Sequence, residues 1–567
     1  MQTQVEKRWL ISENENPIPM EVEAALGKYP FVLRRLLHNR GITTAEEAER
    51  YLNKEGSLHD PWMLQDMEAV VERLLLAVDR GEQMVVYGDY DVDGVTATVM
   101  MVQVLRRLGG QVREYIPNRF EEGYGLNCEA LEGLAAEGAQ VVVTVDCGIR
   151  SPAEAHLARR LGVDLIISDH HEPHEEVPAA FGVISPKRPD NTYPDTNLAG
   201  VGVAYKIVEA LLTRRPLEGC AAEDWLDLVA VGTVADIVPL VGENRSLVKA
   251  GLRRMRQGPR RGLASLAGAA EIQLNKITAR DIGYGLGPRL NAAGRLESAL
   301  ASFHLLDEED GEQASVMAQH LDDQNRQRQD LTLFMQRVAE EQMAERPAAH
   351  LVFASSPEFN MGVVGLVASR LTELYYRPSV VGARGEEFTR ASCRSIPEFH
   401  ITQALDECTD LLVRHGGHSM AAGLTVRNED VEELVSRLQE IAHRELDGRE
   451  LKPVVRADLA LELRDLRPEL LPLMDQIEPT GMANHGVYFV TRGLQVRRFK
   501  TVGREQQHLR LTVSDGHGLL YDAIGFRLGH WAEQMPERVD LLYAFEKNIY
   551  MGRESLQLNV RDLKPAD

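Results

Sequence analysis

Three regularly spaced aspartates are the residues of this chain best suited to chemistry. Asp89, Asp91 and Asp93 directly follow an apolar run at residues 84–87, which predicts a buried strand. In an extended chain, a spacing of two points the three carboxylates the same way. Crowded anions at the end of a buried strand need cations, and hard oxygen ligands suit Mg²⁺ or Mn²⁺. The motif alone also fits a solvated acidic turn, but Asp and His residues after later strands favour a metal site.

Predicted strands and helices alternate from residue 83 onward. The expected strands are residues 84–87, 112–116, 141–145 and 165–168, and the expected helices are residues 95–108, 129–136 and 153–161. Such alternation predicts a parallel sheet covered by helices on both faces, with the active site beyond the carboxyl ends of the strands. Asp146 follows the third strand, and Asp169, His170 and His171 follow the fourth. We therefore expect these side chains to join the first three aspartates.

A helical region at residues 199–230 leads into a further candidate ligand, Asp236, which lies among apolar and small residues. A single buried aspartate is usually a satisfied helix cap. Because a cation site is already predicted nearby, we interpret Asp236 as a metal ligand.

Basic and glycine-rich segments further along the chain could hold phosphate. Residues 249–261 contain Lys and Arg without an acid, which fits either a phosphate backbone or a solvated helix face. Residues 287–296 combine Arg289, Asn291 and Arg295 with Gly and Ala, which favours an anion site. Three glycine-flanked motifs lie at residues 362–370, 391–395 and 416–423. Backbone N–H groups and cations in such motifs can bind phosphate, although each motif alone fits an ordinary turn.

Composition limits the class of protein. The 567 residues are too many for one core, and 44% hydrophobic with 26% charged residues is ordinary for a globular protein. The five cysteines are scattered without a Cys-x-x-Cys pair, which indicates neither a disulfide framework nor a zinc knuckle. No apolar run is long enough for a membrane span and the N-terminus lacks a signal-peptide core, so we expect a cytoplasmic protein. A net charge of −23 argues against general nucleic-acid coating but allows a local basic groove.

Two further regions are predicted from pattern. Residues 312–343 are polar, Gln-rich and helix-forming, which predicts a long solvent-exposed connector. Short strands are expected at residues 507–512, 519–524, 540–545 and 555–560, which suggests a small β-barrel of OB type. Aromatic and basic residues at 488–489 and 497–500 suit capture of a single strand by stacking and charge, although the aromatics fit core packing equally well.

The order of the acidic motifs resembles that of the Asp-His-His (DHH) phosphoesterases. The motifs are Asp89-Tyr90-Asp91-Val92-Asp93-Gly94, Val145-Asp146-Cys147-Gly148, Asp169-His170-His171 and Val234-Ala235-Asp236. With residues 117–126, residues 286–296, Gly416-Gly417-His418 and the tail at residues 552–560, the chain is similar over nearly its whole length to the RecJ family of single-strand-specific 5′→3′ DNA exonucleases.

The resemblance implies an α/β fold with a parallel-sheet DHH domain and a second α/β domain joined by a long helix, followed by a C-terminal OB-type β-barrel. It divides the chain into a helical lead-in (1–80), a DHH catalytic domain (81–262), a helical connector (263–347), a DHH-associated α/β domain (348–447), and a hinge with an OB domain (448–567).

The resemblance also implies site residues. Two ions, Mn²⁺ or Mg²⁺, are expected on Asp89, Asp91, Asp93, Asp146, His170 and Asp236, with Asp146 bridging. The catalytic residues would be Asp91, Asp93, Asp146 and His171, of which His171 contacts the scissile phosphate or orients water. The DNA contacts would be Arg119, Arg289, Asn291, Arg295, Ser392, Arg394, Gly417 and His418.

Three positions depart from the pattern of this family. Tyr87 stands where some relatives carry a histidine, Phe359-Asn360 replaces a Trp-His pair, and Ala483-Asn484-His485 replaces Gly-Asn-Pro. Since the acidic motifs are intact, we interpret the changes as divergence in DNA-binding parts.

The expected activity is stepwise hydrolysis of single-stranded DNA from the 5′ end, in repair and recombination, by a monomer that acts with a helicase and a single-strand-binding protein. One alternative is a nano-RNase or cyclic-dinucleotide phosphodiesterase of the same superfamily, which needs no β-barrel. Another is a non-catalytic DNA-binding scaffold, which would have lost metal ligands.

Overall fold

The computed structural model describes residues 5–52, 58–119, 122–123, 125–174, 176–345, 350–550 and 553–566. The described residues form two compact units, one of residues 58–451 with Val5, and one of residues 6–52 with 452–566. Within the described ranges, no helix combines the length and apolarity needed to cross a membrane. Parts of the expected motifs at residues 117–126 and 552–560, including Phe120, Glu121, Tyr124 and Gly552, lie outside the described residues.

The first domain of the larger unit is built on a parallel sheet with the order β3-β2-β4-β5-β6. Its strands are β2 (Gln83–Gly88), β3 (Gln111–Tyr115), β4 (Val141–Val145), β5 (Asp164–Ser168) and β6 (Gly182–Ile184). The chain runs from β2 to β3 on one side and then returns to place β4 on the other side of β2. In a doubly wound sheet, this reversal opens a crevice between the carboxyl ends of β2 and β4.

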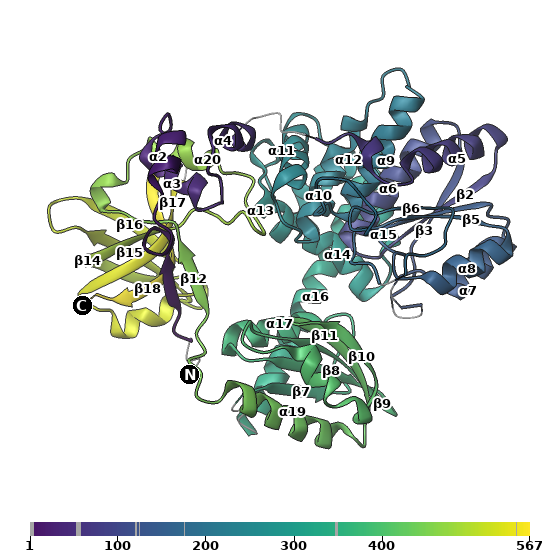
Figure 1. The fold of residues 1–567 in the computed structure, drawn as a ribbon. Helices are drawn as coiled ribbons and strands as arrows, with labels where there is room; N and C mark the ends of the chain where they lie inside the picture. Colours follow the sequence, from purple (N-terminus) through teal and green to yellow (C-terminus); the bar gives the residue numbers. More distant parts are fainter. Residues whose placement is uncertain are drawn as a thin grey trace. The chain divides into compact units, whose positions relative to one another are not determined.

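Helices cover both faces of this sheet, as Figure 1 shows. The helices α5 (Met67–Arg80), α6 (Val92–Arg107) and α9 (Gly200–Arg214) pack with Met84 and Val86 of β2 on one face. The helices α7 (Cys128–Ala136) and α8 (Pro152–Leu161) pack with Val85 and Tyr87 on the other. This alternation follows from the two-residue period of a strand. The predicted parallel sheet is confirmed, although β6 was not predicted.

A helical layer continues the first domain. Its elements are α10 (Leu226–Ala235), α11 (Gly242–Gln257), α12 (Arg261–Ala269), α13 (Ala279–Asp281), the π-turn η4 (Ile282–Leu286), α14 (Gly287–Leu296), α15 (Leu300–Asp307) and α16 (Gly311–Glu345). The prediction that residues 312–343 form a solvent-exposed helix is wrong for one face of α16. Helix α16 buries a face that includes Leu321, Asp322 and Met335, because it packs against α12, α14 and α17 (Val364–Tyr375).

Three arginines of residues 249–261 have partners within the domain. Arg260 donates to both carboxylate oxygens of Asp227 at 3.0 and 3.1 Å, and Arg256 donates from Nε to the Ile277 carbonyl at 3.1 Å. Arg254 lies 3.2 Å from Asp224. These cations therefore tie helices together within the domain.

The second α/β domain carries a mixed sheet with the order β10-β11-β9-β8-β7. Its strands are β7 (Val352–Ser356), β8 (Ser379–Arg384), β9 (Phe388–Arg394), β10 (Leu412–His418) and β11 (Ala421–Arg427). Helix α17 and the end of α16 pack on one face, and α18 (Ile401–Asp406) and α19 (Val431–Leu446) on the other.

The smaller unit closes into a β-barrel. Strands β14 (Phe489–Val502), β15 (His508–Ser514), β16 (Leu520–Gly525), β18 (Arg553–Pro565) and β17 (Arg538–Tyr550) follow one another, and β14 also pairs with β17. The barrel prediction is confirmed, although β14 was not predicted. Phe489 lies in the core, whereas Arg497, Arg498, Phe499 and Lys500 are at least partly exposed on β14.

The N-terminal segment belongs to this smaller unit, which the sequence did not indicate. Strand β1 (Arg8–Ile11) pairs in parallel with β12 (Val454–Ala457), as seen in Figure 1. Helices α2 (Met20–Ala25), α3 (Phe31–His38) and α4 (Ala45–Leu52) follow. Thr44 caps the start of α4, because its hydroxyl accepts a hydrogen bond from the Glu47 amide at 3.2 Å.

Asn484 fastens this segment to the rest of the unit. Its amide nitrogen donates to the carbonyls of Ile477 and Pro479, at 3.1 and 2.7 Å. Its oxygen accepts from Arg40 Nε at 3.0 Å and from the Tyr51 hydroxyl at 2.8 Å. Asn484 matches the Asn of the Gly-Asn-Pro pattern, so only Ala483 and His485 depart from it, and the buried Asn484 has a structural role.

We predict that Asn484→Ala lowers the free energy of unfolding of this unit by about 3 kcal/mol, because buried partners lose four hydrogen bonds together. The matched control is His485→Ala, whose side chain is exposed and should change stability little. Urea unfolding measures both variants, and equal midpoints would contradict the structural role.

Candidate metal centre

The carboxyl ends of β2 and β4 bring the predicted acidic residues together. Potential ligand atoms form three groups, and inside each group the atoms lie within 4.8 Å of one another. The groups are Asp89, Asp91 and Asp146; Asp93, His170 and Asp236; and Asp146, His170 and His171. His170 Nε2 lies 3.1 Å from Asp146 Oδ1 and 3.5 Å from Asp236 Oδ2. All the residues expected to hold metal thus meet at the crevice that the strand order creates.

Backbone geometry places each carboxylate. Asp91 caps α6, and its Oδ1 accepts from the amides of Asp93 and Gly94 at 2.9 and 3.1 Å. Asp93 accepts from the amides of Gly200 and Val201, at the N-terminus of α9, at 2.7 and 2.9 Å. The partial positive charge of a helix N-terminus favours an anion there.

Asp146 occupies the most constrained position of the cluster. Its φ of 63° lies in the left-handed region, which is uncommon for a residue other than glycine and is often found at functional sites. Gly200 makes room for it, because a Cβ at Gly200 would lie 2.5 Å from Asp146 Oδ1. The close approach of α9 therefore requires glycine.

Burial makes this concentration of charge unfavourable without a cation. Burial first, and then neighbouring carboxylates, raises the pKa of Asp93 to about 7 and that of Asp236 to about 9. The same causes raise the pKa of Asp89 and Asp146. Burial lowers the pKa of His170 to about 3, which keeps this imidazole neutral and able to ligate.

The unpartnered atoms fit a divalent cation. Asp89 Oδ1, Asp146 Oδ1, Asp236 Oδ2 and His170 Nε2 are buried without a hydrogen-bond partner. Buried polar atoms are normally paired, so these four call for a ligand from outside the chain. Their set of oxygens and one imidazole nitrogen suits Mn²⁺ or Mg²⁺. The side chain of His170 also hydrogen-bonds the backbone of Leu198, a contact that orients a metal-binding imidazole.

Asp169 is a positioning residue that the sequence analysis did not assign. Its Oδ1 lies 2.7 Å from His171 Nδ1 and also accepts from the amides of His170 and His171, while Oδ2 accepts from the Ile149 amide at 2.9 Å. Burial alone would lower the pKa of His171, but the hydrogen bond and charge of Asp169 outweigh it and raise that pKa. Asp169 therefore favours a protonated His171 at the edge of the cluster.

Tyr87 does not join the metal ligands. Its ring lies in the core under α7 and α8, stacked on Tyr115 of the neighbouring strand at 5.1 Å. Its hydroxyl donates to the Gly125 carbonyl at 3.0 Å and accepts from Asn127 at 3.2 Å. Tyr87, which departs from the family pattern, thus supports the loop that follows β3 instead of supplying a metal ligand.

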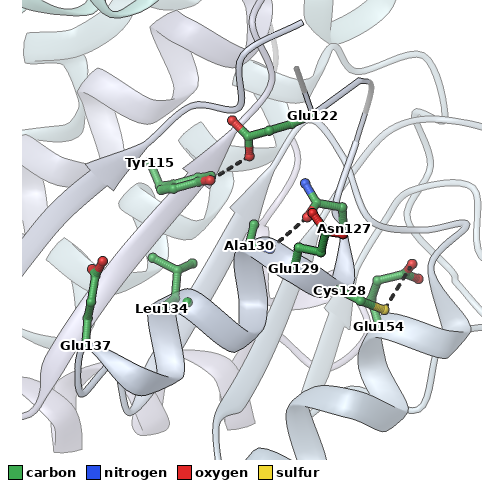
Figure 2. Close-up of a pocket in the computed structure, with 10 residues that line it drawn as sticks. Tyr115, Glu122, Asn127, Cys128, Glu129, Ala130, Leu134, Glu137 and Glu154 are labelled. Atoms are coloured by element: carbon green, nitrogen blue, oxygen red, sulfur yellow. Dashed lines mark hydrogen bonds between the residues drawn. The ribbon is translucent and has the colours of Figure 1, made fainter. Parts of the chain in front are cut away.

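A pocket of about 690 Å³ lies beside this loop and away from the aspartate cluster. Figure 2 shows the Tyr115 hydroxyl pointing to Glu122, and Cys128 beside Glu154. Tyr115 donates to Glu122 at 2.6 Å, and Glu122 accepts from the Asn118 amide at 2.7 Å. The two stacked tyrosines therefore contact Glu122 and Gly125, on the C-terminal side of Arg119.

Arginines gather next to the acidic cluster. Arg119 lies over the Tyr90 ring at 5.0 Å. Burial, followed by the charges of Arg119 and Arg328, lowers the pKa of Arg295 to about 10, while Asp91 opposes this effect. Burial and the charge of Arg119 also lower the pKa of Arg394. Arg119 thus interacts electrostatically with both Arg295 and Arg394, and Arg295 with Asp91, so we call these three predicted DNA contacts the basic cluster.

Other predicted DNA contacts have different surroundings. Arg289 donates to the buried Asp322 at 2.8 Å and to the Gly285 carbonyl at 2.9 Å, which gives it a structural role on α14. Asn291 is half-buried on the same helix. Asn360 is a turn residue, since its side chain accepts from the Gly362 amide at 2.7 Å before α17 begins.

Strand register aligns the remaining contacts across three strands. His418 on β10 pairs with Ala421 on β11, which pairs with Arg394 on β9. Gly423 of β11 pairs with both Gly416 and Ser392. Gly417 has a φ of 149° and lies so close to β11 that a Cβ would lie 2.4 Å from the Ala421 carbonyl. Arg394 donates to Ser392 Oγ at 3.0 Å, so these residues share one surface.

Comparison with known proteins agrees with this arrangement. Residues 83–233 match the model of the DHH family N-terminal domain, residues 348–444 the DHHA1 domain, and residues 457–562 the RecJ OB domain. The single-stranded-DNA-specific exonuclease RecJ of Bacillus subtilis is 36% identical over 98% of this chain and 70% of its own length.

The chain belongs to the RecJ family. The crystal structure of RecJ from Thermus thermophilus with Mn²⁺ matches with a TM-score of 0.84 and 28% identity, over 100% of this chain and 80% of the other. Its Mg²⁺ complex matches with a TM-score of 0.78 and 26% identity, over 100% and 79%. The RecJ fold and its divalent cations agree with the donor set found here.

We predict that Asp146→Asn abolishes metal-dependent activity yet stabilises the metal-free protein, because it removes one of several repelling buried carboxylates.

In the metal-free wild type, the raised pKa values of Asp93 and Asp236 mean that the native state binds more protons than the unfolded chain. The free energy of unfolding should therefore fall as pH rises from about 4 to about 9. Thermal unfolding in chelator measures this slope. A rising slope, or turnover by the variant, would contradict the prediction.

We also predict that Gly200→Ala weakens Mn²⁺ binding about tenfold or more, because the added methyl group displaces Asp146. The matched control is Gly133→Ala on α7, where an added Cβ meets nothing within 4 Å. Calorimetric titration with Mn²⁺ compares them, and equal affinities would show that α9 does not set the position of Asp146.

Proposed function

We propose that this protein is a divalent-metal-dependent exonuclease that hydrolyses single-stranded DNA from the 5′ end and releases 5′-mononucleotides, in DNA repair and recombination. The observation that carries the proposal is the pair of adjacent clusters with opposite charge. Buried carboxylates without a cation lie beside half-buried arginines that have no acidic partner among the contacts described above. A phosphodiester bound with metal would satisfy both clusters.

The metal ligands in this proposal are Asp89, Asp91, Asp93, Asp146, His170 and Asp236, with Asp146 between the two ligand groups that contain it. When bound, the divalent ions lower the pKa of water and neutralise charge on the phosphate. Asp93 also anchors α9, since both its oxygens accept backbone hydrogen bonds. Asp91 similarly combines ligation with capping α6.

His171 is proposed to act on the scissile phosphate directly. Asp169 fixes its Nδ1 side and raises its pKa, so the imidazolium can donate a hydrogen bond or place a positive charge at a phosphate oxygen. The same hydrogen bond fixes the ring orientation. This role requires the Asp169 carboxylate, which does not itself face the substrate in the proposal.

The basic cluster is proposed to hold the DNA backbone and its 5′ end. Arg119, Arg295 and Arg394 present guanidinium groups that suit bidentate contact with phosphate. Ser392, Gly417 and His418 would add hydroxyl, backbone and imidazole contacts along the aligned strands. Arg289 and Asn291 would act through the shape of α14, since Arg289 already bonds Asp322.

The barrel is proposed to bind the strand further from the cut. Phe499 is 47% exposed and stands among Arg497, Arg498 and Lys500 on β14. A base can stack on such a ring while the cations contact its backbone. A nano-RNase or cyclic-dinucleotide phosphodiesterase has no use for this surface. A non-catalytic scaffold has no use for the complete set of acidic residues.

The partners beyond DNA are proposed from the reaction class alone. An exonuclease confined to single strands needs another protein to open a duplex, and its substrate is normally coated. We therefore propose a helicase and a single-strand-binding protein as partners of a monomeric enzyme, and the cytoplasm as its location.

The decisive experiment compares the two ends of the substrate. Single strands labelled at the 5′ or the 3′ end are incubated with Mn²⁺. Mononucleotides should be released first from the 5′ end, because the basic cluster lies beside the metal ligands and can seat a terminal phosphate. Release from the 3′ end first would contradict the proposed polarity.

We further predict that Arg394→Ala slows degradation of a 5′-phosphorylated strand roughly tenfold or more, through loss of a charge-assisted hydrogen bond. A 5′-hydroxyl strand, which lacks the partner charge, should suffer less. Arg390→Ala is the control, since Arg390 is exposed on the same strand β9. An identical penalty on both substrates would assign Arg394 a different role.

A further inference from the structure

A second cluster of ligand-forming side chains lies in the second α/β domain, outside the acidic centre. It consists of His350, just before β7, His443 in the last turn of α19, and Asp447, which follows that helix. One ligand atom from each lies within 4.8 Å of the others. We propose that these three residues bind a divalent transition-metal ion, with Zn²⁺ as the preferred ion and water in the remaining position.

The distances approach those of a metal site. Asp447 Oδ1 lies 3.7 Å from His350 Nε2 and 4.0 Å from His443 Nδ1. The two imidazole rings are 5.0 Å apart between centroids. Metal–ligand distances of about 2 Å put neighbouring ligand atoms of a tetrahedral ion a little over 3 Å apart, so small side-chain rotations close the site. Two imidazoles and a carboxylate are a donor set that Zn²⁺ accepts.

The backbone that carries these side chains is fixed by packing. Leu351, next to His350, is fully buried, as are Ala442 and Leu446 on either side of the His443 turn. Gln439 donates to the Leu351 carbonyl at 2.6 Å, which joins α19 to the start of β7. His443 and Asp447 are four residues apart, and the Asp447 amide donates to the His443 carbonyl at 3.0 Å. The backbone segments that carry the three ligands are thus held together before any ion binds.

Electrostatics also favours a cation here. Asp447 places a carboxylate at the C-terminus of α19, where the helix dipole already concentrates negative charge. Burial and the neighbouring His443 lower the pKa of His350, so this imidazole is neutral and does not offset Asp447 by itself. The charge of Arg377 also lowers the pKa of His350, and this arginine donates to the Tyr376 carbonyl. A bound ion would join the beginning of β7 to the end of α19 and stabilise this edge of the domain.

The test counts zinc ions bound to the full-length protein. Wild type and variants are stripped with chelator, dialysed against equal micromolar free Zn²⁺, and measured by elemental analysis. Because the acidic centre also takes Zn²⁺, the informative quantity is the difference between variants. Wild type should hold one more ion per chain than His443→Ala or Asp447→Asn, both of which change exposed side chains.

The matched control is His320→Ala, because His320 is an exposed histidine 4.0 Å from Glu297 and belongs to none of the ligand clusters among the described residues. It should bind as many ions as wild type. With Mn²⁺ in the assay, His443→Ala should retain the nuclease rate of wild type, which separates this site from the acidic centre. Equal zinc counts in wild type, His443→Ala and Asp447→Asn would overturn the proposal.

Discussion

The concentration of buried negative charge at the ends of β2 and β4 is the constraint on which the rest of the larger unit depends. Asp89, Asp93 and Asp146 are almost fully buried, and none is neutralised by a cation of the chain in the contacts described. The fold compensates locally. The N-terminus of α9 contacts Asp93, a left-handed backbone turns Asp146 inward, and Gly200 lets the helix approach. The remaining charge is left for divalent metal.

An excess of positive charge lies beside this acidic cluster. Burial and the charge of Arg119 lower the pKa of Arg295 and of Arg394, which is unfavourable unless an anion binds. The negatively charged cluster and the positively charged cluster adjoin at Asp91. In the proposed function, a metal-bound phosphodiester would relieve both, so the electrostatic cost that each cluster imposes on folding would become binding energy for the substrate. Arg289 and Arg260 show the contrast, because each has a buried carboxylate of its own and is available for structure only.

Predictions from the sequence succeeded where local pattern and chemistry agree. The strands that precede Asp89 and Asp146 are apolar runs of the expected length, and β4 has the predicted bounds. They failed where partners are distant. The strand β1 pairs with β12, more than 400 residues away, and no local signal shows that contact. No local signal shows the structural role of Asn484 either, because its partners Arg40 and Tyr51 belong to the other end of the chain. Similarly, α16 is polar along its sequence, yet its small and apolar residues cover neighbouring helices.

The sequence by itself determined the donor set, the parallel sheet and the family resemblance, because these depend on residue type, spacing and strand periodicity. Only the tertiary structure decided which donors act together. It separated Tyr87 from the ligands, since strand alternation turns the ring towards α7 and α8. It assigned Asp169 to His171, and divided the arginines between structural ion pairs and the basic cluster. The physical reason is that the energy of a charge depends on its burial and on the partners within a few ångströms, and both are set by packing between segments far apart in the chain.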